Sequence, residues 1–593
     1  MSTVLRAVQS SWRSSFGRAA GAAGAVGVLV GCSVRECDGL SQRGNLTCCE
    51  QERAAKRLRR TASEGMQRRD LVRCRGGQNE LGESYELKDR LGSGSFGSVR
   101  KAIHRMTGLP RAIKSVEMMK EGEEGLHRGI EAEWDRMLAE VEALMDLDHP
   151  NIVRLYEYFR TPDTLFLVEE YCSGGTLEQR LETAGGRFSA EESAVVLRQM
   201  LRGLLCCHAH GLAHRDLKPD NFVYGSSDPS ASLKMIDFGL SLAPGQLTPL
   251  AYVEAAGTLE YTAPETLPRR DNDGRLTRAV RYNQAADMWS VGAILFLMLT
   301  GEPLVDFERL RTSSAEFRRM MKAVVGGVER DLLDDAATKV RNEKFINSRL
   351  AVARRHAPPA ACELLAGLLE LEPSKRLSAT QALKHRFITD SYRLHPRGHG
   401  VFDGEIIPKM RRFADAPALR RLAVLVEAHL LGPQDDDAIR KCVLTFRSAD
   451  SEGLGILKAA DIGHALREQG LEVPDDLSEI CACIDVNGDG TVNLIEFVAA
   501  TMEPQLFCEP RLCKAAFRVL DHDGDGYITQ ADLQAMLMEG PHRKERAQSI
   551  LESAEMDERG RIDFARFCAA LVPTDADPSL AVRVAEYMSK SFV

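Results

Sequence analysis

The sequence predicts an α+β protein in which a small sheet-rich lobe precedes a larger helical lobe, followed by an all-helical domain. Four short β-type stretches surround one helical stretch near residues 134–145, and the apolar spacing becomes mostly helical after about residue 175. Four acidic loops then begin at Asp450, Asp485, Asp521 and Glu555. Their spacings of 35, 36 and 34 residues mark an internal repeat of helix–loop–helix size.

The β-type stretches run through the residues expected to form the small lobe, at 85–91, 98–103, 111–116 and 165–169. The apolar run Ala285–Leu299 contains Asp287 and is too short to cross a membrane, so it is interpreted as a buried helix. Beyond His385, a polar link leads to an amphipathic segment with Leu419, Leu422, Val426 and Leu430 at helical spacing.

The composition is that of a soluble globular protein, with 593 residues, 44% of them hydrophobic and 27% charged. The net charge of −9 gives no indication of nucleic-acid binding. Residues 1–80 carry 14 Lys and Arg against 7 Asp and Glu, whereas the last third is acidic. The 15 cysteines show no metal-ligand spacing, which favours reduced thiols in a cytoplasmic protein.

The basic N-terminal stretch contains a Gly- and Ala-rich run, Ala19–Val30, that follows several arginines. We interpret residues 1–84 as a mobile, variable extension, with an organelle-targeting segment as the alternative. Residue 2 is Ser rather than Gly, which excludes N-myristoylation.

The stretch from Gly92 to Val99, GSGSFGSV, has glycines that let backbone N–H groups approach phosphate oxygens. A dinucleotide-binding turn would be followed by a helix, but here a second strand follows, so the hairpin interpretation is preferred. Lys114 lies on the next strand, where it can hold phosphates, and Glu140 lies on a helix where it can orient that lysine. The candidate nucleotide-binding residues are Leu91, Gly92, Ser93, Gly94, Ser95, Phe96, Gly97, Val99, Lys114 and Glu140.

The stretch His214–Asn221, HRDLKPDN, supplies the remaining chemistry on one loop. Asp216 can accept a hydroxyl proton, and Lys218 can neutralise a phosphoryl group during transfer. Asn221 and Asp237 of Asp237-Phe238-Gly239 offer the oxygen ligands that Mg²⁺ prefers. Asp216, Lys218, Asn221 and Asp237 are therefore the candidate catalytic residues.

With these motifs in this order, residues 85–388 resemble a eukaryotic protein kinase, which implies a bilobal fold, ATP and Mg²⁺. A lysine at position 218 is similar to the serine/threonine kinases rather than to the tyrosine kinases. Arg376 stands where the family has a buried ion-pair partner for Glu265. Two positions depart from the family pattern. Glu169 occupies the gatekeeper position behind the adenine, and Thr176 replaces the Glu of the common GGEL motif. The preference for basic substrates is therefore in doubt.

The second and third acidic loops have the spacing of EF-hand calcium loops, with oxygen ligands at positions 1, 3, 5, 7, 9 and 12 and Gly at position 6. The second loop offers Asp485, Asn487, Asp489, the Thr491 carbonyl, Asn493 and Glu496. The third offers Asp521, Asp523, Asp525, the Tyr527 carbonyl, Thr529 and Asp532. Because Asp532 is one methylene shorter than Glu, weaker calcium binding, or binding of magnesium at rest, is expected there.

The first and fourth loops lose ligands and are expected to be metal-free partners of the inner two. The loop at Asp450 has Leu454 at position 5 and Lys458 at position 9. The loop at Glu555 has Arg559 at position 5 and Arg566 at position 12, which put positive charge on a cation site.

Kinase-like and EF-hand segments in one chain resemble the calcium-dependent protein kinases of plants and protists, over residues 85–575. The resemblance implies a junction that occupies the kinase cleft until calcium draws it away. The stretch Pro408–Phe413 and the amphipathic segment after it suit that role. The expected parts are the kinase domain at 85–388, the autoinhibitory junction at 389–435, EF-hand pairs at 436–503 and 504–575, and a tail at 576–593.

The function expected from these features is calcium-activated transfer of the ATP γ-phosphoryl group to Ser or Thr of proteins. The alternative is a calcium-responsive scaffold whose kinase fold binds nucleotide but turns over poorly. The expected partners are protein substrates and the chain's own junction helix. We expect a monomer that contains no transmembrane segment and binds no nucleic acid.

Overall fold

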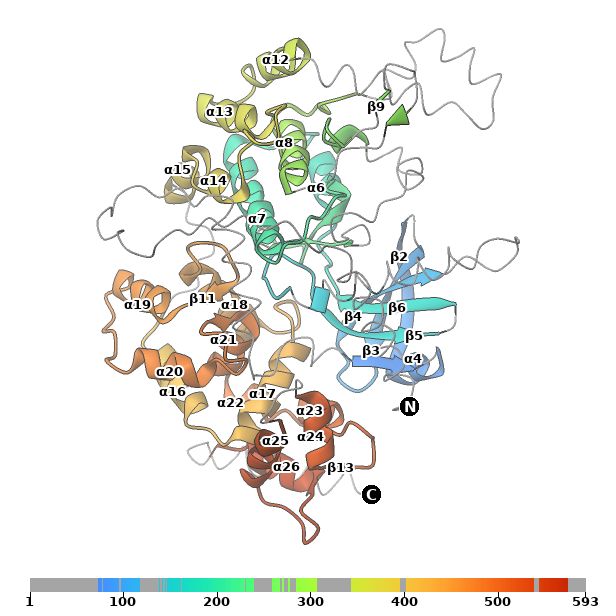
Figure 1. The fold of residues 1–593 in the computed structure, drawn as a ribbon, viewed down its shortest axis with the longest axis vertical. Helices are drawn as coiled ribbons and strands as arrows, with labels where there is room; N and C mark the ends of the chain where they lie inside the picture. The colour runs from blue at the N-terminus through green and yellow to red at the C-terminus, as the bar shows by residue number, and fades with distance from the viewer. Residues whose placement is uncertain are drawn as a thin grey trace, which may run out of the picture. The chain divides into compact units, whose positions relative to one another are not determined.

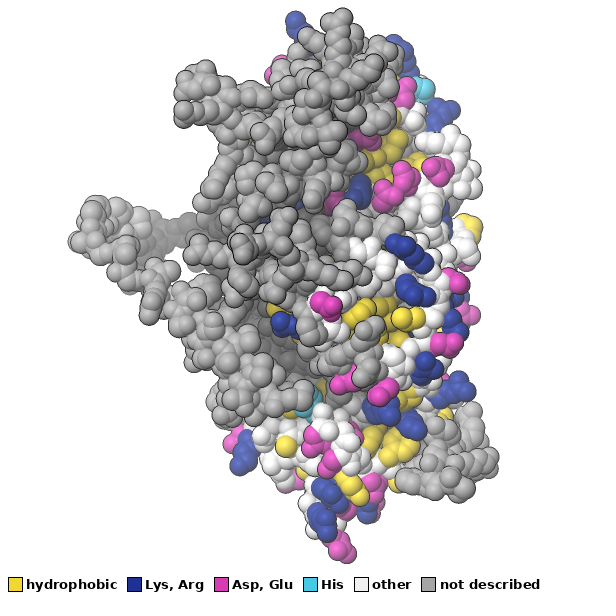
Figure 2. Space-filling model, turned by 90° about the vertical axis from the view of Figure 1, so that its right-hand side faces the viewer, with side chains coloured by type: hydrophobic (Ala, Val, Ile, Leu, Met, Phe, Trp, Pro, Cys, Tyr) yellow, Lys and Arg dark blue, Asp and Glu magenta, His cyan; other side chains and the backbone are white. Residues whose placement is uncertain are grey.

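The computed structural model describes most of residues 73–573, with its longer gaps at 118–137, 239–258, 278–283, 307–342, 395–401 and 538–542. Among the described residues, no helix combines the length and apolar content that crossing a membrane requires. On the face shown in Figure 2, positive and negative side chains are interspersed over the described part of the surface.

The small lobe is a six-stranded sheet with the strand order β1-β5-β6-β4-β3-β2 (Figure 1). Its strands are β1 (Arg73–Gly76), β2 (Tyr85–Gly94), β3 (Gly97–His104), β4 (Pro110–Glu117), β5 (Leu155–Arg160) and β6 (Thr164–Glu170). All neighbours pair antiparallel except β1, which is parallel to β5. The four predicted strands correspond to β2, β3, β4 and β6. Residues 138, 141, 144 and 145, within the predicted helix of this lobe, are helical.

The last part of the predicted mobile extension is ordered, which differs from the prediction. Residues 73–76 form β1, and Gln78–Ser84 forms helix α4. Leu81 and Tyr85 are 2% and 4% exposed and pack into a core with Phe159 of β5. Burial of these two side chains secures the segment, and β1 covers a sheet edge that would otherwise be open. Residues 1–72 lie outside the described part of the chain.

The larger lobe is mostly helical and has one extended core around α7 and α8. Its helices are α6 (Leu177–Thr183), α7 (Ala190–Ala209), α8 (Gln284–Thr300), α12 (Glu343–Ala353), α13 (Pro359–Leu368), α14 (Ala379–Leu383) and α15 (Arg386–Leu394). Small hairpins pair β7 (Phe222–Tyr224) with β8 (Leu233–Met235) and β9 (Arg269–Arg270) with β10 (Leu276–Thr277). Helix α7 begins at a capping box of Ser189 and Glu192, in which each side chain accepts from the other residue's backbone N–H. Helix α8 is buried along nearly its whole length, as the sequence predicts.

The C-terminal region is all-helical apart from two-residue strands and has its own core. Its helices are α16 (Ile406–Ala414), α17 (Ala418–Leu430), α18 (Asp437–Ala449), α19 (Ala459–Glu468), α20 (Leu477–Ile484), α21 (Leu494–Thr501), α22 (Pro504–Phe507), α23 (Pro510–Leu520), α24 (Gln530–Met536), α25 (Arg543–Glu552) and α26 (Phe564–Leu571). Short antiparallel strands join the first acidic loop to the second and the third to the fourth. β11 (Ile456–Leu457) pairs with β12 (Val492–Asn493), and β13 (Tyr527–Ile528) with β14 (Ile562–Asp563).

Helix α17 packs against helices from both pairs of repeats, α21 on one side and α23, α25 and α26 on the other. Of the apolar residues predicted at helical spacing, Leu419, Leu422 and Val426 are buried in this C-terminal core, and Leu430 is half-buried against it. The described part of the junction is therefore packed among the EF-hand helices.

Candidate active site and cation-binding loops

The predicted catalytic loop brings three polar side chains together in the large lobe. The ammonium of Lys218 donates to Oδ2 of Asp216 at 2.9 Å. Nδ2 of Asn221 donates to the Asp216 backbone oxygen at 2.7 Å and to its Oδ2 at 3.1 Å. These bonds hold the Asp216 carboxylate beside a cation, and they leave the Asn221 amide oxygen as the group that can face a metal ion.

Asp237 joins this group from the end of a different strand, β8. Its backbone has φ of 65°, a left-handed conformation that costs a non-glycine residue on the order of 1–3 kcal/mol. Its Oδ1 lies 3.0 Å from Nζ of Lys114, which comes from β4 of the small lobe. The two lobes thus meet through the predicted phosphate-binding lysine and the predicted magnesium carboxylate. Glu140, predicted to orient Lys114, lies outside the described residues.

The glycine-rich stretch is a β-hairpin, as predicted, because Gly92 pairs with Val99 and Gly94 with Gly97 across β2 and β3. Gly97 has φ of 151°, and a Cβ at this position would lie 1.8 Å from the backbone oxygen of Ser115. Only glycine fits at this point of the hairpin. Leu91 is exposed at the strand end, and Ser95 and Phe96 lie outside the described residues.

Asp287 of α8 holds the backbone of the catalytic loop in place, a role that the sequence did not suggest. It is fully buried, and its carboxylate accepts the backbone N–H of His214 at 3.0 Å and of Arg215 at 2.9 Å. His208 lies 2.9 Å from the same carboxylate. Although burial alone would raise the pKa of Asp287, the bonds from His208 and Arg215 lower it below its usual value. A charged residue in an otherwise apolar run was the signal that could have indicated this role.

Arg376 and Glu265 form the buried ion pair that the sequence predicts. Nη1 of Arg376 lies 2.6 Å from one carboxylate oxygen of Glu265, and Nη2 lies 3.1 Å from the other. This two-point contact joins residues 111 positions apart and fixes Glu265 to the large lobe.

The two departures from the kinase pattern have different surroundings. Glu169 is buried on β6 and pairs across the sheet with Ala112 of β4, two residues before Lys114. Thr176 caps helix α6, since its side chain accepts from the backbone N–H of Gln179 and the Gln179 side chain accepts in return. Its hydroxyl therefore serves the helix start.

The second EF-hand loop is closed by its predicted position-12 residue. Glu496 is 2% exposed, and its Oε1 accepts the backbone N–H groups of Val486 and Asn487 at 2.9 and 3.2 Å. Asp485 accepts from Gly488 and Gly490, and Asp489 accepts from Thr491. Burial, followed by the charges of Asp485 and Asp489, raises the pKa of Glu496 well above its usual value. A divalent cation would offset that repulsion, so the donor set fits calcium.

The third loop has the same plan around a shorter closing residue. Asp532 is also 2% exposed, and it accepts from His522 and Asp523 at 3.0 and 3.2 Å and from Thr529 at 2.8 Å. Its shorter side chain thus reaches the backbone groups equivalent to those that Glu496 contacts. The carboxylates of Asp521, Asp523 and Asp525 offer ligand atoms within 4.8 Å of one another. These oxygen donors also fit a divalent cation.

The outer two loops lie beside the inner ones and contain groups that do not suit a cation. In the fourth loop, Arg561 makes an ion pair with Asp557 at 3.0 Å, and Arg566 makes one with Asp563. In the first loop, the two carboxylate oxygens of Asp450 accept from the backbone of Gly453, Leu454 and Gly455. Lys458 occupies position 9 of this loop and presents no oxygen side-chain ligand.

Residues 85–388, about half of the chain, match the protein kinase domain family. This chain belongs to the protein kinase family. Residues 509–572 of this kinase match the EF-hand domain pair, which covers the third and fourth loops.

The similarity to curated relatives extends well beyond the kinase domain. Calcium-dependent protein kinase 5 of Plasmodium falciparum is 28% identical over 82% of this kinase and 78% of its own length. Calcium-dependent protein kinases 33 and 8 of Arabidopsis thaliana are 28% and 29% identical, over 82% and 83% of this kinase and 84% of their own lengths.

Proposed function

We propose that this protein is a serine/threonine kinase that is activated by calcium. The observation that carries the proposal is the joint presence of the Asp216–Lys218–Asn221 group and a calcium-fitting loop closed by Glu496. All three relatives described above are named calcium-dependent protein kinases, and each aligns with at least 82% of this chain.

In the proposed reaction, Asp216 accepts the proton of the substrate hydroxyl and Lys218 balances charge that develops on the phosphoryl group. The ATP phosphates would be held by Lys114 and the glycine-rich hairpin, and Asn221 and Asp237 would hold Mg²⁺, which supplies charge neutralisation. The protein supplies positioning, because Asp287 fixes the backbone of the catalytic loop and keeps these side chains at hydrogen-bonding distance.

The proposal is tested by phosphoryl transfer from radiolabelled ATP to a mixture of Ser-, Thr- and Tyr-containing peptides, with calcium and with a chelator. We expect label on Ser or Thr and at least about a tenfold increase with calcium. Nucleotide binding without transfer under either condition would instead support the alternative, a calcium-responsive scaffold.

We further infer that the junction around α16 and α17 regulates the kinase within a single chain. Its buried apolar face suits an EF-hand groove, and Arg411 and Arg412 on the other face suit an acidic cleft. A synthetic peptide of residues 406–430 should therefore inhibit the calcium-activated enzyme. Absence of inhibition at a peptide concentration of about 1 mM would contradict an autoinhibitory role. We also propose a monomer, which sedimentation measurements with and without calcium would test.

A further inference from the structure

The first EF-hand-like loop is unusual because it has lost calcium ligands yet buries its first residue and two of its glycines. Asp450 is 2% exposed, and Gly453 and Gly455 are buried as well. The glycines at the same two positions of the second and third loops are exposed, namely Gly488, Gly490, Gly524 and Gly526. Calcium binding does not explain the burial of these glycines, because the first loop has lost calcium ligands that the second and third loops retain.

The groups that cover the loop belong to the kinase domain. Nη2 of Arg202, on α7, donates to the backbone oxygen of Asp450, and its Nη1 donates to that of Arg447 at 3.4 Å. A Cβ on Gly453 would lie 2.6 Å from Cγ of Arg202. A Cβ on Gly455 would lie 2.7 Å from the ring of His149 and 3.0 Å from the backbone oxygen of Asp148.

Loop geometry alone does not require this close approach. Gly455 has φ of 78° and Gly560, at the same position of the metal-free fourth loop, has φ of 73°. Both need the left-handed conformation that the turn imposes. A Cβ on Gly560 would meet nothing within 4 Å, whereas one on Gly455 would meet the kinase. Small size at Gly455 therefore serves a contact between domains.

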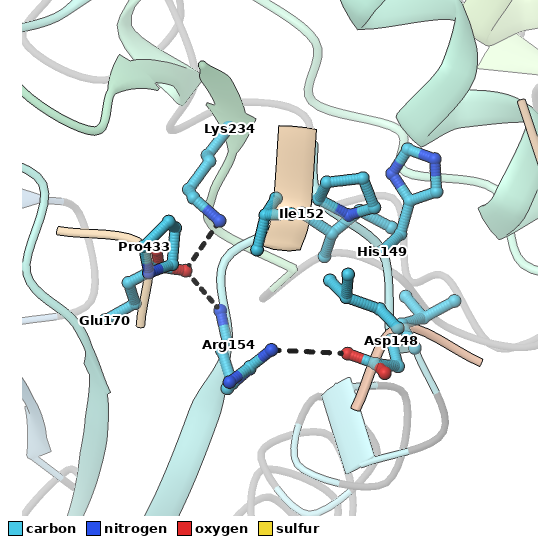
Figure 3. Close-up of a pocket in the computed structure, with 11 residues that line it drawn as sticks. Asp148, His149, Ile152, Arg154, Glu170, Lys234 and Pro433 are labelled. Atoms are coloured by element: carbon cyan, nitrogen blue, oxygen red, sulfur yellow. Dashed lines mark hydrogen bonds and ion pairs between the residues drawn. The ribbon is translucent and has the colours of Figure 1, made fainter. Parts of the chain in front are cut away.

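The same kinase segment also contacts the second, calcium-fitting loop. Oδ2 of Asp148 accepts the backbone N–H of Ile495 at 3.0 Å, and Ile495 directly precedes Glu496. Asp148 also lies 3.8 Å from Arg154, whose guanidinium points toward it in Figure 3. Burial, together with the cations Arg202 and Arg447, lowers the pKa of His149 well below its usual value. The neutral ring suits close packing against a glycine.

We propose that the first loop is a docking element that binds the kinase domain at Asp148, His149 and Arg202 and holds no calcium. Because β11 and β12 join the two loops, this docking holds the second loop against Asp148. Movement of Glu496 on calcium binding then acts on the kinase through the adjacent residue. The expected effect of calcium on kinase activity rests on the proposed function, whereas the docking contact itself does not.

The test compares Gly455→Asn with Gly560→Asn in the full chain. Asn tolerates the left-handed conformation, so the two variants carry similar backbone strain and differ in whether the new side chain meets the kinase. Hydrogen–deuterium exchange at residues 147–155 and 450–457 is measured in saturating calcium. We expect Gly455→Asn to speed exchange in both segments by about tenfold or more and to lower calcium-stimulated activity, while Gly560→Asn does neither. Equal exchange in the two variants would overturn the proposal.

A second variant, changed in the kinase domain instead of the loop, distinguishes loss of docking from misfolding of the first loop. Arg202→Met keeps most of the side-chain stem but removes both donors to the loop backbone. It should speed exchange at residues 450–457, with helix content unchanged by circular dichroism. If exchange there stays at the wild-type rate, the proposed docking is wrong. If the wild-type protein transfers no phosphate but the exchange differences remain, the docking stands and the proposed function fails.

Discussion

The catalytic residues illustrate what single side chains contribute to this kinase. Asp216 contacts Lys218 of its own loop at 2.9 Å, and Asp237, on a separate loop, contacts Lys114 of β4 at 3.0 Å. Asp237 holds its place in a left-handed backbone conformation, and so does Arg215, with φ of 74°. Such strain persists only where the surrounding structure enforces it, which indicates a preorganised site.

We predict that Asp216→Asn and Lys114→Met each lower phosphoryl transfer by at least about a hundredfold, because both residues act by position and charge. The thermal unfolding midpoint should stay close to that of the wild type. Lys88→Ala, which removes an exposed lysine of β2 paired with Glu86, is the matched control and should leave transfer unchanged. Substantial activity in either active-site variant would show that the residue has another role.

Glu178, which lies near the catalytic loop, makes a pH-dependent contribution to the stability of the folded protein. Its hydrogen bond with Asp220, then burial and nearby carboxylates, raise its pKa to about 7. The folded protein therefore binds more protons than the unfolded chain between the ordinary glutamate pKa and about pH 7, so stability falls as the pH rises through that range. We expect the unfolding temperature to drop less between about pH 5 and pH 8 in Glu178→Gln than in the wild type. Glu83→Gln, which changes an exposed glutamate of helix α4, should behave like the wild type, and an equal drop in all three proteins would refute the assignment.

At the scale of elements, the sequence predicted what local patterns determine. Strands β2, β3, β4 and β6 followed from alternation and β-branched residues, and the Arg376–Glu265 pair followed from motif order. Strand β1 was missed, because Arg73-Cys-Arg-Gly76 has no alternation and is a strand only through its pairing with β5. The role of Asp287 was missed because it depends on a loop that the fold brings to the helix from about 70 residues away.

The contacts between the kinase and the EF-hand helices could not be predicted from sequence either. Arg154 donates to the backbone oxygens of Ala428, His429 and Leu431 at 3.1, 3.3 and 2.7 Å, and so caps the C-terminus of α17. Every residue has a backbone oxygen, so the residue types at the end of α17 do not indicate which of them accept these hydrogen bonds. In Figure 3 the backbone of Arg154 contacts Glu170, which also binds Lys234 at 2.8 Å. The capping residue Arg154 is therefore anchored by Glu170 at the end of β6.

We expect the end of α17 to depend on a second cation from the kinase, Arg111 of β4. Arg111 lies 3.2 Å from the Asp435 carboxylate, and their side chains are 4% and 0% exposed. Arg111→Leu leaves that carboxylate buried without its cation and should cost about 3–5 kcal/mol of stability. Arg111→Leu with Asp435→Leu should cost less than the sum of the single changes, as measured by denaturant unfolding. Arg386→Ala breaks an exposed pair with Glu363 and should cost at most about 1 kcal/mol. Strict additivity at Arg111 and Asp435 would show that they act independently.

At the scale of the whole molecule, hydrogen bonds and ion pairs join the kinase domain to the EF-hand region at several separate points. The kinase domain holds the C-terminus of α17 with Arg111 and Arg154, the first loop with Arg202 and the second loop with Asp148. The first two loops thus contact the kinase directly, and α17 also links the kinase to the third and fourth repeats, because it packs against α23, α25 and α26. A change in either pair of loops therefore has a physical route to the kinase.

The last prediction concerns which loop senses calcium. Sensor EF-hands bind calcium at about 10⁻⁷ to 10⁻⁵ M, and a bidentate Glu at position 12 completes the coordination and moves the second helix. Only the second loop ends in Glu, and Glu496 directly follows the residue that binds Asp148. Glu496→Gln should therefore shift activation to at least about tenfold higher calcium or abolish it, and Asp532→Asn should do less. The third loop retains three clustered aspartates and can still hold a cation that steadies its pair of repeats. Calcium titrations of activity on the two variants decide between them, because greater damage from Asp532→Asn would make the C-terminal pair the sensor.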